Sequence, residues 1–92
     1  MSVAWLRAVA STRVGSPGEW AVLVALAVHQ GGRDGVAWPS LSRIASHTGL
    51  SQRHVRTCVR KLEARGMVER VERPARLPAT GYVRSVFYRV TI

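Results

Sequence analysis

Residues 52–65 place basic side chains at a spacing that would gather them on one side of a helix. At 100° per residue, that side consists of Arg53, Arg56, Thr57, Arg60 and Ala64. The other side spans an arc of about 100° and consists of Val55, Cys58, Val59 and Leu62. Gln52 and Lys61 flank the basic side. The pattern predicts a helix that buries one side in a hydrophobic core and offers the other to a partner.

The chemistry that suits such a surface is recognition of DNA. The planar guanidinium group of arginine can donate two hydrogen bonds to O6 and N7 of guanine, and Gln52 can bond adenine in a comparable way. Each such pair contributes about 1–3 kcal/mol of discrimination between bases. Three arginines on an isolated helix would favour a solvated charged surface instead. Their position after a capped turn, in a strongly basic half of the chain, favours DNA contact.

Metal binding and catalysis find less support. His54 and Cys58 lie four residues apart and His47 precedes them, which is a spacing that can bind a metal ion. A structural zinc site needs four ligands, however, and Cys58 is the only cysteine. Cys58 also falls on the apolar side of its helix, where a thiol cannot reach a substrate. We therefore expect no metal, no cofactor and no enzymatic activity.

A longer helix is expected to precede this surface. It begins with Ser16 as the N-cap and Pro17 as the first helical residue, and it ends near Gln30, before two glycines. One of its sides carries Trp20, Leu23, Val24 and Ala27. The nearly opposite side carries Val22 and Leu26. A helix that is apolar on both sides is usually central in its fold.

Two short helices, at about 41–48 and 52–65, are joined by four residues, which is helix-turn-helix spacing. Ser40 and Ser51 are the expected caps, and the N–H groups at these helix N-termini can bind phosphates. Arg43, on the first of the two helices, is a further candidate for a phosphate contact.

A β-hairpin is expected after Gly66, with strands at 67–73 and 83–92 and a loop at 74–81. Three arginines at the strand ends and in the loop could contact DNA, namely Arg73, Arg76 and Arg84. An arginine held between prolines loses little entropy on docking and could enter a narrow minor groove. The alternative is a solvated hairpin tip that contacts phosphates only.

Residues 1–15 have an ambiguous pattern, so the expected organisation is an N-terminal segment followed by a domain at 16–92. The segment could cover the second apolar side of the long helix. Alternatively, Trp5 and the Val22/Leu26 side could form the contact of a homodimer.

Length and charge fit a single basic domain. The chain has 92 residues, of which 47% are hydrophobic, and a formal net charge of +9. Residues 43–92 hold 11 of the 14 cationic residues and three of the five acidic residues, which gives this half a net charge of +8. Such an excess favours a polyanionic partner, with nucleic acid before an anionic membrane surface.

The remaining composition indicates an intracellular protein. A single cysteine excludes an intramolecular disulfide, which fits a reducing compartment. The longest apolar run, Trp20–Val28, is too short to span a bilayer, and no signal peptide is apparent. We expect a cytoplasmic, nucleoid-associated protein with no membrane partner.

Residues 18–92 resemble the winged helix-turn-helix family of bacteria and phages. The resemblance is carried by Trp38-Pro39-Ser40, Ile44-Ala45, Thr48-Gly49-Leu50-Ser51, Val55, Val59, Leu62-Glu63, Gly66 and Val68. Residues 20–27 are similar to the helix that precedes this pattern in the family. The most similar branch is found in phage regulators and replication initiators.

This resemblance implies an α+β fold, mainly α, with a three-helix core and a C-terminal β-hairpin wing. Residues 52–65 would be the recognition helix in the major groove of double-stranded DNA, and residues 67–92 the wing that contacts the flanking groove. The implied function is sequence-specific DNA binding by a transcriptional regulator of phage or mobile-element type. The expected DNA-binding residues are Ser40, Arg43, Ser51, Gln52, Arg53, Arg56, Thr57, Arg60, Lys61, Arg73, Arg76 and Arg84.

Two other interpretations stay open at this point. The domain could be the DNA-binding module of a replication initiator or excision factor, which would use the same chemistry for another task. It could also be a protein-interaction winged helix, in which the basic half of the chain meets an acidic partner protein.

Overall fold

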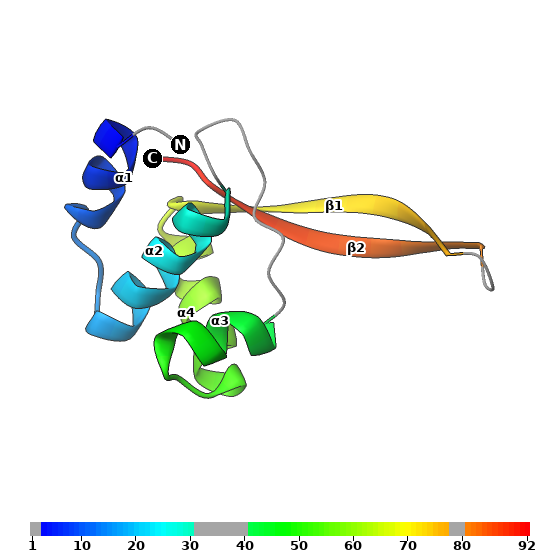
Figure 1. Cartoon of the computed structure of the whole chain (residues 1–92), viewed down its shortest axis with the longest axis horizontal. Coiled ribbons are helices and arrows are strands. Elements are labelled where there is room, and N and C mark those ends of the chain that lie inside the picture. Colours follow the sequence, from blue (N-terminus) through cyan, green and yellow to red (C-terminus); the bar gives the residue numbers. More distant parts are fainter. Residues whose placement is uncertain (1–2, 31–40, 78–80) are drawn as a thin grey trace.

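The computed structural model describes residues 3–30, 41–77 and 81–92, with only the backbone course for 72–77 and 81–87. Its helices are α1 (Val3–Ala10), α2 (Pro17–Gln30), α3 (Leu41–Thr48) and α4 (Gln52–Ala64). Two strands follow, β1 (Val68–Leu77) and β2 (Gly81–Val90). The hairpin extends like an arm from the helices (Figure 1). This mainly helical α+β architecture confirms the predicted winged helix-turn-helix fold.

Local signals place the helix ends. The Ser16 hydroxyl accepts the Glu19 N–H at 3.2 Å, and the Ser51 hydroxyl accepts the His54 N–H at 3.1 Å, so both serines satisfy donors that a helix start leaves unpaired. Gly49, in the turn between α3 and α4, has a φ of +77°, which a residue with a side chain rarely adopts. These signals keep α3 and α4 as two helices separated by a tight turn.

The core surrounds α2, which packs against α1, α3, α4 and β2. Leu23 and Ala27 on one side of α2 and Val22 and Leu26 on the other are all fully buried. Trp20 was expected beside Leu23 and is instead 43% exposed. Its indole N–H donates to the carbonyl of Ala10 at 2.7 Å, which holds the ring at the surface where α1 ends.

Of the two alternatives for Trp5 and the Val22/Leu26 side, the structure shows packing within one chain, which buries these side chains. Residues 3–10 form a helix that packs on α2, and Trp5 is only 5% exposed. The Trp5 indole N–H donates to the carbonyl of Ile92 at 2.7 Å. The N-terminal helix therefore contacts the chain's last residue and not a second copy through this surface.

The two strands pair antiparallel from Val68↔Val90 at the base to Leu77↔Gly81 near the tip. The expected loop at 74–81 was therefore too long, and β2 ends at Val90 instead of Ile92. Pro74 lies within β1, opposite Arg84. Proline is tolerated there because both strands of a two-stranded ribbon are edge strands.

Polar contacts fix the base of the hairpin to the helices. The Gln30 side chain at the end of α2 accepts the Val90 N–H at 2.6 Å and donates to the Val90 carbonyl at 3.4 Å. The Thr91 N–H donates to the carbonyl of Met67, and the Thr91 hydroxyl donates to that of Gly66. The direction in which the hairpin leaves the helical core is thus set by buried bonds as well as by packing.

Two histidines, one at the end of α2 and one at the end of α3, lie in contact. A ring nitrogen of His29 lies 3.3 Å from one of His47, and the ring centroids are 4.9 Å apart. Burial lowers the pKa of His29, and the nearby His47 and Arg43 lower it further. Protonation of His29 therefore opposes this contact.

Replacing Gln30 by alanine should lower the free energy of unfolding by about 1–3 kcal/mol, because the buried Val90 N–H would lose its acceptor. Urea denaturation followed by circular dichroism measures this change. The exposed amide of Gln52 provides a matched control, since Gln52→Ala should change the free energy by only about 0.5 kcal/mol or less. Equal effects of the two substitutions would contradict the role assigned to Gln30.

Stability should also depend on pH through His29. Its pKa is lower in the folded chain than in the unfolded one, so its stabilising effect is complete above the unfolded-state value and is lost as the pH falls through the folded-state value. Between about pH 7.5 and about pH 5 the parent should lose more unfolding free energy than His29→Asn. Carboxyl groups titrate alike in both proteins. Parallel pH profiles of the two proteins would argue against this effect.

Candidate nucleic-acid interface

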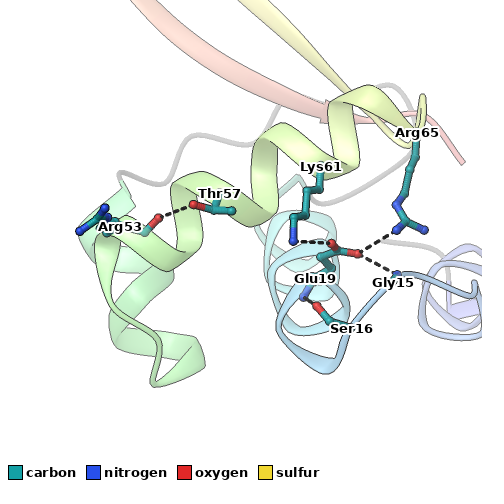
Figure 2. Close-up of polar contacts among 7 residues, drawn as sticks. All are labelled: Gly15, Ser16, Glu19, Arg53, Thr57, Lys61 and Arg65. Carbon is teal, nitrogen blue, oxygen red and sulfur yellow. Dashed lines mark hydrogen bonds and ion pairs between the residues drawn. The ribbon is translucent and has the colours of Figure 1, made fainter.

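The two sides of α4 differ as the spacing predicts. Its apolar residues Val55, Cys58, Val59 and Leu62 are buried. The side chains on its other side are exposed, namely Gln52, Arg53, Arg56, Thr57 and Arg60. The Thr57 hydroxyl donates to the carbonyl of Arg53 at 3.1 Å, one turn earlier, and keeps its lone pairs available as acceptors (Figure 2). The structure therefore brings five of the expected DNA-binding residues to one continuous surface of α4.

The turn before α4 positions the start of this surface. Ile44 buries the inner side of α3, whereas Arg43 on the same helix is exposed. The Ser51 hydroxyl is engaged by the N–H of His54, so Ser51 acts first as the cap of α4. The other expected cap, Ser40, lies outside the described residues. Arg43 thus lies exposed near the start of α3, and the Ser51 cap sets where α4 begins.

Lys61 does not belong to the same surface. Its ammonium nitrogen lies 3.9 Å from one carboxylate oxygen of Glu19, and Arg65 lies 3.7 Å from the other. Figure 2 shows both side chains pointing to Glu19, away from Arg53 at the far end of α4. The expectation that Lys61 contacts DNA is therefore not supported by where its side chain lies.

Glu19 has a structural role that no local sequence pattern predicts. Its side chain is 1% exposed and accepts the Gly15 N–H at 2.7 Å. It thereby joins the loop before α2 to the last turns of α4. The signal in the sequence was one acidic residue in an otherwise neutral apolar stretch, but its cationic partners, Lys61 and Arg65, are more than 40 residues away.

The hairpin arginines are placed by the strand register. Arg73 lies opposite Ser85, Arg84 opposite Pro74, and Arg76 opposite Tyr82, all between the middle and the tip of the arm. Their side chains lie outside the described part of the structure. The register therefore carries these arginines away from α4 along the hairpin, and the structure does not bring them together with it.

Two residues near α4 were missed. A cavity of about 430 Å³ between α4 and the hairpin base is lined by Arg56 and Arg60 and also by Arg70 and Tyr88. Neither Arg70 nor Tyr88 is among the expected DNA-binding residues. Their place beside α4 depends on the strand register, which pairs Arg70 with Tyr88 and could not be predicted from the sequence.

The described residues show neither a cluster of metal ligands nor an accessible thiol. Across 3–30, 41–77 and 81–92, no three His, Cys, Asp or Glu side chains gather closely enough to hold a metal ion. The Cys58 thiol is buried, and burial raises its pKa, as does the nearby Glu19. A buried thiol with a raised pKa is a poor nucleophile. Within the same residues, no helix is long and apolar enough to cross a membrane.

Removal of the Glu19 carboxylate should destabilise the junction of α2 and α4. Glu19→Ala leaves the Gly15 N–H without its acceptor, so the free energy of unfolding should fall by about 1–3 kcal/mol. Lys61→Ala should cost at most about 1 kcal/mol, because Lys61 is largely solvated. Thermal and urea denaturation of the two variants provide the comparison. A larger loss for Lys61→Ala than for Glu19→Ala would contradict this description of the junction.

Comparison with known proteins locates the same region. The sequence pattern of a helix-turn-helix domain family matches residues 16–68, which run from the Ser16 cap through α2, α3 and α4 to the first residue of β1. Searches of curated proteins and of solved structures found no match. The family match covers more than half of the chain and coincides with the helices that carry the exposed basic surface. The chain therefore belongs to the helix-turn-helix domain family.

Proposed function

We propose that this protein binds double-stranded DNA in a sequence-specific manner and regulates transcription, as a regulator of phage or mobile-element type. The observation that carries the proposal is the exposed surface at the start of α4, where Gln52, Arg53 and Thr57 face away from the buried side. The family match suggests DNA binding. The regulatory role is proposed from the resemblance of residues 18–92 to a branch that includes phage and transcriptional regulators as well as replication initiators.

The dimensions of α4 suit the major groove. Its 13 residues form a helix about 20 Å long, and the groove is about 12 Å wide, which admits one helix. Side chains near the N-terminus of an inserted helix reach base edges first. Gln52 and Arg53 therefore act as the principal base contacts in this proposal. Thr57 lies one turn farther along α4.

The remaining basic groups fit the DNA backbone around that helix. Arg43 and the N–H groups before α3 and α4, at Ser40 and Ser51, bind phosphates beside the groove. The hairpin arm carries Arg73, Arg76 and Arg84 toward the flanking groove. The excess of arginine over lysine suits this use, because guanidinium groups bind phosphates and bases in two-bonded geometry.

Selection of bound sites from a random pool of duplexes, followed by affinity measurements, tests the proposal. Arg53→Ala should weaken binding to the selected site about 5- to 150-fold and change binding to random DNA much less, because it removes a base contact. Arg7→Ala, which removes an exposed arginine on α1, is the matched control and should bind like the parent.

The same measurements define the results that would overturn the proposal. Affinity for every duplex no better than about millimolar would leave an acidic protein as the better partner, because specific DNA sites bind many orders of magnitude more tightly. Equal losses for Arg53→Ala on selected and random DNA would show a phosphate contact where we place a base contact.

A further inference from the structure

The cavity between α4 and the hairpin base concentrates positive charge. Its volume is about 430 Å³. Its charged lining consists of the guanidinium groups of Arg56, Arg60 and Arg70 and the carboxylate of Glu63, so positive charge exceeds negative by two. Leu41 and Val59 add apolar surface. A concave site with several guanidinium groups and an apolar wall suits an anion that carries a nonpolar substituent.

The helix α4 and the two strands of the hairpin converge at this cavity. Arg56 and Arg60 lie one turn apart on α4, and Arg70 of β1 is paired with Tyr88 of β2 across the hairpin. The bonds of Gln30 to Val90 fix the strand two residues beyond Tyr88. The two strands and the helix are therefore held in one arrangement before any ligand binds, which lowers the entropy cost of binding.

The Tyr88 phenol can donate a hydrogen bond in this cavity. Burial raises the pKa of Tyr88 and Glu63 raises it further, whereas Arg70, Arg56 and Arg60 oppose this shift. The phenol is therefore protonated at neutral pH. All three arginines line the same cavity as Tyr88. Three guanidinium groups and one O–H donor match the oxygens of a phosphate group.

We propose that this cavity is a phosphate site in which Arg56 and Arg60 of α4 and Arg70 and Tyr88 of the hairpin base bind one phosphate. The proposal rests on the proposed DNA binding and deepens it. The phosphate is a diester of the DNA strand that crosses between α4 and the hairpin, and the apolar wall accommodates its sugar. Arg56 and Arg60 then hold the backbone, and base reading falls to Gln52, Arg53 and Thr57.

Neutral DNA phosphates test the site directly. Single phosphates of a selected duplex are replaced in turn by methylphosphonates, and each duplex is titrated with the parent and with Arg70→Ala. One position should weaken the parent about tenfold or more and weaken Arg70→Ala far less, because the variant has already lost that contact. Arg65→Ala, whose guanidinium contacts Glu19, is the control and should respond to each methylphosphonate like the parent.

The salt dependence gives an independent measure. Arg70→Ala should bind selected and random DNA more weakly by similar factors, and its slope of log affinity against log salt should be smaller by about 1. Tyr88→Phe should weaken binding without changing that slope, since it removes a donor and no charge. The proposal is overturned if Arg70→Ala keeps the parent's affinity and slope, or if both proteins respond equally to every methylphosphonate.

Titration with inorganic phosphate, followed by the NMR signals of the Tyr88 ring, separates this site from the proposed function. If the protein binds DNA but Arg70 is irrelevant to it, the phosphate site is wrong and DNA binding stands. If no duplex binds, yet phosphate shifts the Tyr88 signals saturably in the parent and not in Arg70→Ala, DNA binding is wrong and the ligand is a free phosphate compound. The absence of both responses contradicts the phosphate site.

Discussion

Val55, Cys58, Val59 and Leu62 attach α4 to the core by one side, and a helix attached in this way must expose the other. That single constraint determines which arginines face solvent and which contact the protein. Arg53 is exposed because it lies opposite the buried side, whereas Arg65 lies close enough to the core to reach Glu19. The family match covers this helix and the two before it, and therefore describes the elements that impose the constraint.

Hydrogen bonds hold the base of the hairpin to the same core. Gln30 ends α2 and binds both backbone groups of Val90, so the helix that supports α4 also sets the base of the arm. Trp5 adds a bond from α1 to Ile92. The orientation of the hairpin relative to α4 is thus fixed within the protein, and under the proposed function neither would need to be ordered first to bind DNA.

Local chemistry made α2, α3 and α4 predictable, whereas α1 lies in a segment whose pattern was ambiguous. Ser16, Ser51 and the glycines after the helices marked boundaries that the structure reproduces to within one residue. The first strand was predicted too short because Pro74 costs less in a two-stranded ribbon than in a wider sheet, and the second was predicted two residues too late. Lys61 is directed toward Glu19, and Arg70 is placed by its pairing with Tyr88. Both are long-range contacts that no local sequence pattern contains. The backbone of the wing was partly predictable, but the residues at its junction with α4 were not.

The central claim, that the start of α4 enters a DNA groove, is tested most directly by NMR. Backbone amide signals of the labelled protein are compared before and after addition of a duplex chosen by selection. The account predicts the largest shifts at residues 52–57, followed by residues around the turn before α4 and the hairpin arm. Shifts confined to α1 and the exposed side of α2 around Trp20, with α4 unchanged, would contradict it.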